Sequence, residues 1–126
     1  RAEFSETVGY KIYGPNKTAL FIPDIDKWYL WEKSIIDEIK KVDYALIDAT
    51  FYDAREVNYR DLSEIPHPFV VESMELFDSI KDEEKNKIFF IHLNHTNPLI
   101  NEKSEEYKLV IGKGYNVAKE GMILKL

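Results

Sequence analysis

The segment 88–91 constrains the fold most, because it places four apolar residues, Ile-Phe-Phe-Ile, in one uninterrupted run. A strand without alternation between polar and apolar residues is buried on both faces, which requires further layers above and below its sheet. A second short apolar run lies at 44–49. Apolar residues recur at helical spacing in 28–41 and 70–80, which predicts amphipathic helices there. Strands that alternate with helices indicate a layered α/β domain.

The rest of the chain is predicted to complete a single domain. Residues 8–13 and 19–23 flank the turn-forming sequence Gly-Pro-Asn-Lys and are expected to form a hairpin. A third helix is expected around 102–111, a solvated loop in the charged run 81–87, and a terminal strand at 122–126. The 126 residues show no internal repeat or domain boundary, and their number is typical of one domain.

Charge and cysteine content exclude several classes of function. The net charge of −6 disfavours nucleic acid bound through a broad phosphate-neutralising face. The absence of cysteine removes disulfides, thiolate zinc sites, iron–sulfur clusters and cysteine nucleophiles. No apolar run approaches the ~20 residues of a membrane span. We therefore expect a cytoplasmic protein with no membrane partner, in which any metal is bound by His, Asp and Glu.

Polar side chains occur where the predicted strands end, at the edge where α/β proteins place ligands and catalysts. Asp24 follows the hairpin, Asp48 ends the next strand, and His92 ends the apolar run and opens a polar loop. Asp24 is a candidate metal ligand or a helix cap, although Asp26 fits the cap better. His92 is a candidate ligand or a core histidine bonded to backbone. Asp48 could bind a metal, orient a ligand or hydrogen-bond a loop.

The other candidates lie in loops. His67 stands between two prolines before a helix, so it is either a rigid loop residue or a general acid or base. His95 could orient a ligand, contact substrate or lie at the surface. Asn94 and Asn97 in the same loop are candidates to contact substrate or the metal ligands. Gly-x-Ser-x-Gly, His-Glu-x-x-His and phosphate-loop motifs do not occur.

Short motifs spread over nearly the whole chain occur in a fixed order. They are Thr7-Val8-Gly9-Tyr10, Ile22-Pro23-Asp24, Asp48-Ala49-Thr50-Phe51, His67, His92-Leu93-Asn94-His95-Thr96-Asn97-Pro98 and Glu120-Gly121-Met122. This order resembles the C-terminal half of metallo-β-lactamase-fold hydrolases. Within them it is most similar to the pyrroloquinoline-quinone biosynthesis protein B group, with tRNase Z and cyclic phosphodiesterases as related branches. The resemblance implies a sandwich of two sheets between helical layers, of which this chain supplies one sheet and its helices.

The resemblance also implies roles for individual residues. Asp24 matches the aspartate that bridges two metal ions, and His92 matches the last metal-binding histidine. His67 matches a histidine kept near the leaving group, which would act as general acid. His95 falls where the quinone-biosynthesis branch commonly has Asn. The implied cofactor is a pair of divalent ions, zinc in the first place, with manganese or iron as alternatives.

One departure from the family is large. The defining His-x-His-x-Asp-His motif is not in the sequence, and Asp24 and His92 are too few for a tetrahedral zinc or a two-metal site. The chain also begins with Arg1. We therefore expect residues 1–126 to be the C-terminal half of one domain, inactive alone, with the missing N-terminal half as its partner; a homodimer is also compatible.

The function implied is hydrolysis of a phosphodiester or similar ester, a small-molecule substrate, by a metal-bound hydroxide. Two other classes stay open at this point. One is a non-hydrolytic role in quinone cofactor biosynthesis, as a metal-dependent oxidation step or a carrier. The other is a metal-free binding module.

Overall fold

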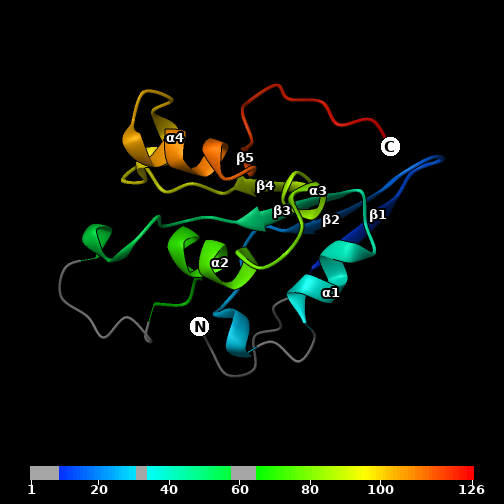
Figure 1. The fold of residues 1–126 in the computed structure, drawn as a ribbon, viewed down its shortest axis with the longest axis horizontal. Helices are drawn as coiled ribbons and strands as arrows, with labels where there is room; N and C mark the ends of the chain where they lie inside the picture. Colours follow the sequence, from blue (N-terminus) through cyan, green and yellow to red (C-terminus); the bar gives the residue numbers. More distant parts are fainter. Residues whose placement is uncertain (1–8, 31–33, 58–64) are drawn as a thin grey trace.

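A computed structural model describes residues 9–30, 34–57 and 65–126 of the chain. The described residues contain one five-stranded sheet with the strands in chain order (Figure 1). Its strands are β1 Tyr10–Tyr13, β2 Thr18–Ile22, β3 Tyr44–Asp48, β4 Ile88–Ile91 and β5 Asn116–Val117. β1 is antiparallel to β2, and every later neighbour is parallel. The α/β class predicted from the sequence is confirmed.

Helices connect each parallel strand to the next. They are α1 Ile35–Lys40, α2 Val70–Phe77, α3 Asp82–Lys85 and α4 Glu105–Gly112, with 3-10 turns at Trp28–Leu30, Ala54–Glu56 and Pro98–Ile100. Crossovers between parallel strands are right-handed, so strands that follow one another across the sheet carry their helices on one face. α1 and α2 lie in front of the strands in Figure 1. None of the described helices is long and apolar enough to span a bilayer.

The helices cover a core formed by alternate strand residues. The buried apolar strand residues that form this core are Leu20, Ile22, Ala45, Ile47, Ile88, Phe90 and Val117. On the helices, Ile39, Phe77 and Val110 are each fully buried against them. Serine side chains begin two of the helices: Ser34 accepts a hydrogen bond from the Asp37 N–H and Ser104 from the Tyr107 N–H, which satisfies otherwise unpaired amides of the first turn.

The opposite face of the sheet is apolar and only half-buried. The register places Phe21 beside Leu46, and Leu46 beside Phe89, on this face. All three are partly exposed, and Ile12 on the edge strand is 46% exposed. The expectation that β4 is buried on both faces is therefore met on one face only, since the described helices all belong to the other layer.

Three local predictions differ from the structure. Helix 28–41 is a 3-10 turn followed by the short α1, while Trp31 lies outside the described residues. The charged run 81–87 contains the helical turn α3 rather than only loop, because Lys81 precedes three acidic residues that favour a helix N-terminus. Residues 122–126 form no strand.

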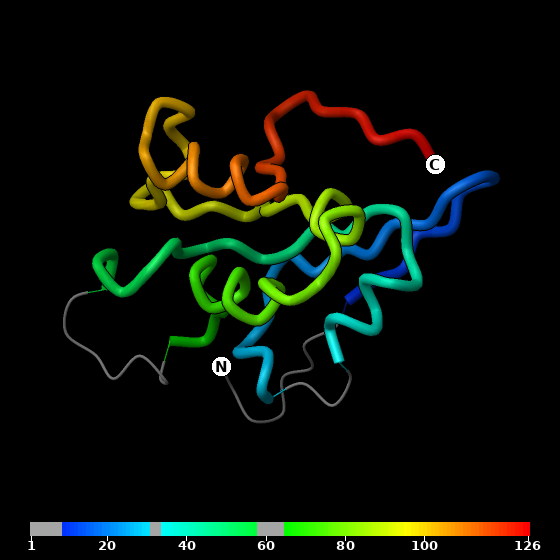
Figure 2. The backbone as a smooth tube through the Cα atoms, in the orientation of Figure 1, coloured from blue at the N-terminus to red at the C-terminus, as the bar shows by residue number. Residues whose placement is uncertain are grey.

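The C-terminal residues instead contact the β1–β2 turn (Figure 2). The carbonyl oxygen of Leu126 accepts hydrogen bonds from the N–H groups of Asn16 and Lys17, at 2.8 and 2.7 Å. The predicted hairpin turn itself is present, closed by the Gly14 N–H and the Lys17 carbonyl at 2.9 Å. The backbone of the last residue is therefore held by the turn rather than by a strand ladder.

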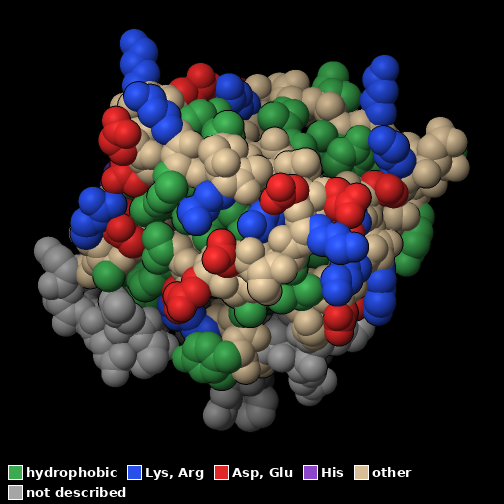
Figure 3. All heavy atoms as spheres, viewed as in Figure 1, with side chains coloured by type: hydrophobic (Ala, Val, Ile, Leu, Met, Phe, Trp, Pro, Cys, Tyr) green, Lys and Arg blue, Asp and Glu red, His purple; other side chains and the backbone are tan. Residues whose placement is uncertain are grey.

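Acidic and basic side chains intermingle on the face of the molecule shown in Figure 3. Among the charged side chains of the described residues, Glu38 pairs with Lys11 and Lys41, and Glu84 pairs with Lys87. Hydrogen bonds from Lys41 and Lys11 lower the pKa of Glu38. A surface of mixed sign offers no continuous basic patch on this face for a polyanion.

Tyr115 offers a test of the core. Its ring is buried against Phe90, with ring centroids 5.6 Å apart, and its hydroxyl has no hydrogen-bond partner among the described residues. Burial, together with the negative charge of Asp78, raises the pKa of Tyr115 to about 12. The pKa of Tyr115 is therefore higher in the folded than in the unfolded protein. Its contribution to the free energy of unfolding is complete below about pH 10 and is lost as the pH rises toward 12.

We predict that Tyr115→Phe raises the free energy of unfolding by about 1 kcal/mol at pH 7, because it removes an unpaired buried hydroxyl. The variant should also lose less stability than the parent between about pH 10 and 12. Urea denaturation at both ends of this range measures the difference, with Tyr10→Phe at an exposed position as the control. A less stable Tyr115→Phe at neutral pH would contradict the prediction.

Candidate metal centre

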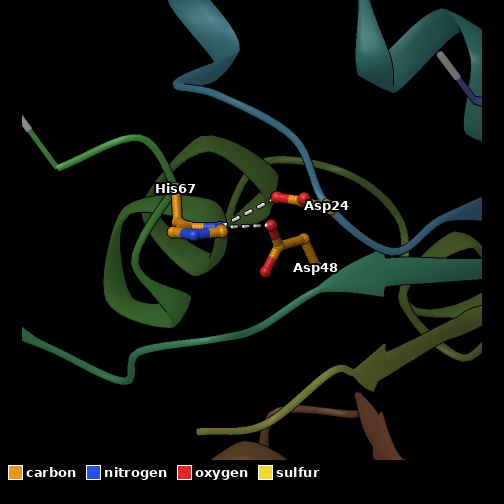
Figure 4. A group of neighbouring side chains, drawn as sticks. All are labelled: Asp24, Asp48 and His67. Carbon is orange, nitrogen blue, oxygen red and sulfur yellow. Dashed lines mark hydrogen bonds and ion pairs between the residues drawn. The ribbon is translucent and has the colours of Figure 1, made fainter. Parts of the chain in front are cut away.

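Three polar side chains meet at the edge of the sheet where parallel strands end. Asp48 is the last residue of β3, Asp24 lies in the segment after β2, and His67 precedes α2. Figure 4 shows the two carboxylates pointing toward the His67 ring from separate parts of the chain. One possible ligand atom from each residue lies within 4.8 Å of the others. The strand-end rule thus predicted both carboxylates, and the structure adds His67 to them.

Asp48 is completely buried, and both of its oxygens are engaged. Oδ1 accepts hydrogen bonds from the N–H of Thr50 at 2.8 Å and from its hydroxyl at 2.7 Å. Oδ2 accepts from the N–H of Ile25 at 2.9 Å and lies 2.8 Å from His67 Nδ1. Burying a carboxylate costs much free energy unless such partners donate hydrogen bonds to it. Of the three roles left open by the sequence, hydrogen bonding to a loop is observed directly, through the N–H groups of Ile25 and Thr50, while binding a metal and orienting a ligand stay predictions.

His67 is placed by Asp48. A carboxylate only accepts, so the 2.8 Å contact requires a proton on His67 Nδ1, and in the neutral ring the lone pair is then on Nε2. Asp24 Oδ1 lies 3.5 Å from the same Nδ1. The ring also packs edge-on against Phe51, with centroids 6.0 Å apart. The His67 imidazole is therefore held in one orientation by specific side-chain contacts. A residue that served only to make the loop rigid would not require them.

His92 lies beside this group. Its ring centroid is 6.3 Å from that of His67, and its Nδ1 is 4.0 Å from Asp48 Oδ1. The residue has φ = 64°, in the left-handed region that non-glycine residues seldom adopt. Its side chain is half exposed. The backbone thus turns sharply directly after β4 and leaves the imidazole at the solvent edge of the site.

Thr50 is the site residue that sequence reasoning missed. Its hydroxyl oxygen lies 3.0 Å from His92 Nδ1 and 3.3 Å from His67 Nδ1, besides donating to Asp48. It is 8% exposed. The signal in the sequence was its spacing two residues after the strand-end Asp48, where a hydroxyl can return to the carboxylate.

The three remaining candidates lie in the loop after β4. Asn97 is buried; its Nδ2 donates to the Ala49 carbonyl at 2.7 Å and its Oδ1 accepts from the Leu99 N–H at 2.9 Å. Asn94 donates from Nδ2 to the hydroxyl of Thr96 at 2.8 Å, and His95 is exposed. Asn97 therefore holds the loop against β3, while substrate contacts by Asn94 and His95 stay predictions.

A partly buried ion pair joins the Asp24 segment to α2. Lys27 is almost completely buried; its Nζ lies 2.6 Å from Glu72 and 4.1 Å above the centre of the Phe69 ring. Glu72 also accepts from the Phe69 N–H, at 2.8 Å. Lys27 follows Asp24 by three residues, and Glu72 follows His67 by five. The ion pair therefore connects the segment that contains Asp24 to the segment that contains His67, a role that the sequence did not indicate.

The loop that follows Thr50 is held by charged side chains. Arg55 pairs with Asp53 and with Glu106 of α4, each at 2.8 Å. Hydrogen bonds from its own backbone and from Arg55 lower the pKa of Glu106. Burial, assisted by the nearby Glu106 and Asp53 charges, raises the pKa of Tyr52. These contacts connect the loop after β3 to α4.

The donor set of the cluster fits a divalent transition metal. Imidazole nitrogen and carboxylate oxygen are both ligands of zinc. Asp24 has a side chain that is 54% exposed, and its Oδ1 lies 3.5 Å from Nδ1 of His67. These residues give two or three ligands, fewer than the four of a structural zinc site.

A comparison with known protein families identifies the class of protein to which this fold and site belong. Residues 1–93 match the family "Beta-lactamase superfamily domain", and the chain belongs to this family.

Two relatives indicate a particular branch of this family. The chain is 29% identical to coenzyme PQQ synthesis protein B of Gluconobacter oxydans (strain 621H), over 96% of this chain and 40% of that protein. It also resembles the crystal structure of zinc-bound PqqB from Methylobacterium extorquens, with a TM-score of 0.70 and 25% identity over 95% of this chain and 44% of that one. The resemblance to this branch is confirmed, and the chain spans about two fifths of the length of both relatives.

Asp48 provides a test of the site's architecture. We predict that Asp48→Asn lowers the free energy of unfolding by about 3 kcal/mol, because an amide NH2 would face buried donors that cost about 1–3 kcal/mol each when unpaired. Asp43→Asn is the matched control: Asp43 also accepts a backbone N–H, from Thr18, but at an exposed position. Urea denaturation of both variants measures the difference, and equal losses would contradict the organising role of Asp48.

Proposed function

We propose that this chain supplies part of a zinc centre, with Asp24 and His92 as metal ligands and His67 as the proton-transferring group. The observation that carries the proposal is the convergence of Asp24, His67 and His92 on the Asp48–Thr50 network at the end of the sheet. Zinc in the PqqB relative's crystal structure supports this metal over manganese or iron. The number of ions, two by family resemblance, is part of the proposal.

The remaining ligands would come from a second part of the domain. The chain covers 40–44% of the length of its relatives, and the candidate donors among its described residues are too few for a closed site. The half-buried apolar face of the sheet, with Phe21, Leu46 and Phe89, would pack against that second part. In a two-sheet sandwich such a face becomes interior.

The chain's residues have clear tasks in such a centre. A bound zinc would supply Lewis acidity and a lowered pKa for coordinated water. Asp48 holds His67 with Nδ1 protonated, so Nε2 can take up a proton and pass it to a leaving group. The ion pair of Lys27 and Glu72 keeps the Asp24 segment at a fixed distance from His67.

A metal-dependent step in the synthesis of a quinone cofactor is the function we place first. Coenzyme PQQ synthesis protein B aligns with nearly the whole chain. Metal-dependent oxidation and a carrier role are both compatible with a centre of this kind.

Hydrolysis of a phosphodiester or related ester is the second candidate. The specific observation in its favour is the Asp48–His67 pair, whose 2.8 Å contact resembles the oriented imidazole of a general acid or base. The family that the chain matches is named for a hydrolase activity.

The metal ligands can be tested directly. In the full-length gene product, Asp24→Ala and His92→Ala should each weaken zinc binding by more than about 100-fold, beyond the roughly 10–100-fold typical of residues that only orient ligands. Equilibrium dialysis with metal analysis measures this. Asp82→Ala, an exposed carboxylate on α3, and His95→Gln, an exposed imidazole, should keep the parent's zinc content. Unchanged zinc in both ligand variants would overturn the assignment.

The chemistry can be tested through His67. Asn at this position can still donate to Asp48 but has no titrating nitrogen, so His67→Asn should keep zinc and lower turnover by about 10²–10⁴-fold. The full-length gene product would be assayed on phosphodiesters, lactones and tyrosine-derived peptides. Turnover confined to the tyrosine-derived peptides supports the first function, and turnover confined to the esters supports the second. Full activity in His67→Asn would contradict its role as the proton-transferring group.

A further inference from the structure

Thr50 occupies a central place between the two histidines. Its Oγ1 lies 2.7 Å from Asp48 Oδ1, 3.0 Å from His92 Nδ1 and 3.3 Å from His67 Nδ1. The backbone fixes this position from both sides: the Thr50 N–H donates to Asp48, and its carbonyl accepts from the Asn94 N–H at 2.9 Å. The hydroxyl therefore has a defined location in the site rather than a freely rotating one.

Counting protons on this network assigns the state of His92. A threonine hydroxyl has one hydrogen to donate and two lone pairs that accept. The carboxylate of Asp48 can only accept, and at 2.7 Å it is the shortest contact, so the hydroxyl hydrogen points there. The oxygen then faces His92 Nδ1 with a lone pair, and a 3.0 Å contact between them requires the hydrogen to be on Nδ1.

The same count applies to His67, which donates to Asp48 directly. Both imidazoles consequently have a proton on Nδ1, and in the neutral form of each ring the lone pair is on Nε2. One buried carboxylate sets the two tautomers, through a direct bond for His67 and through Thr50 for His92. An unrestrained neutral imidazole in water favours the opposite tautomer, with the proton on Nε2, which cannot bind a metal through that nitrogen.

We propose that Thr50 is a positioning residue that holds His92 in the Nδ1-protonated tautomer and so presents its Nε2 to a metal. The inference about the metal rests on the proposed function, whereas the tautomer follows from the contacts of this chain alone. Metal-binding histidines are commonly held through their second nitrogen in this way, and the orienting group sets ring direction as well as tautomer. His92 needs such a partner because its side chain is half exposed.

The tautomer can be measured by nitrogen NMR of the histidine rings. The full-length gene product, metal-free and at about pH 8.5 so that the imidazoles are neutral, would be labelled with ¹⁵N in its histidines. His92→Gln identifies the signals of His92. We expect a protonated-type Nδ1 and a lone-pair-type Nε2 for His92 in the parent protein. A proton on Nε2 of the parent's His92 would overturn the proposal without any variant.

Two substitutions separate the hydroxyl from the shape of the side chain. Thr50→Ser keeps the hydroxyl and should keep the tautomer, with zinc affinity within about threefold of the parent. Thr50→Val keeps the shape but has no oxygen, so His92 should shift toward the Nε2-protonated tautomer and zinc affinity should fall about 10–100-fold. His67 should keep its tautomer in both, since its bond to Asp48 is direct.

The outcomes distinguish this inference from the proposed function. A Thr50→Val protein that folds, as judged by its amide spectrum, and leaves the His92 tautomer unchanged would overturn the role of Thr50. A parent protein with the expected tautomer but no zinc binding would overturn the proposed zinc centre and the metal-presenting purpose of Thr50, while the hydrogen-bond assignment would stand.

Discussion

The buried carboxylate of Asp48 is the interaction on which the rest of the site depends. It joins the segment after β2 through the Ile25 N–H, the loop after β3 through Thr50, and the segment before α2 through His67. A buried carboxylate is costly in free energy unless its oxygens accept hydrogen bonds. The donors on these three segments stabilise the Asp48 charge, and the same hydrogen bonds hold the segments next to one another. This explains how three separate loops are brought together at one site.

The sheet supplies the frame for this arrangement. Because β2, β3 and β4 are parallel neighbours, their carboxyl ends lie at one edge, and the residues that follow them are brought together without long loops. The helices seal one face, while the other face stays apolar and half-buried. This chain, with one covered face of its sheet and a small group of candidate metal donors, spans 40–44% of the length of its relatives.

The features that the sequence predicted correctly are local in the chain. The hairpin follows from Gly-Pro-Asn-Lys between two strand-like segments, and the place of Asp24 and Asp48 at one edge of the sheet follows from polar residues directly after apolar strands. The roles of Asp24 and His92 as metal ligands stay predictions. Sequence reasoning failed where a role depends on a distant partner. The segment 122–126 was predicted to be a terminal strand, yet none of the described strands pairs with it, and its last carbonyl accepts hydrogen bonds from the β1–β2 turn instead. The sequence did not indicate the hydrogen bonds of the buried Asn97 side chain to the Ala49 carbonyl and the Leu99 N–H.

The sequence by itself determined the α/β class, the branch of the family and the edge of the sheet at which the candidate ligands occur, because periodicity and short motifs are local properties of the chain. Only the tertiary structure decided that Asp48 orients its neighbours, that Lys27 and Glu72 join two segments 45 residues apart, and that Thr50 stands between His67 and His92. These roles are set by distances of about 3 Å between residues far apart in the chain. No spacing within a linear sequence specifies such distances before the strands have paired.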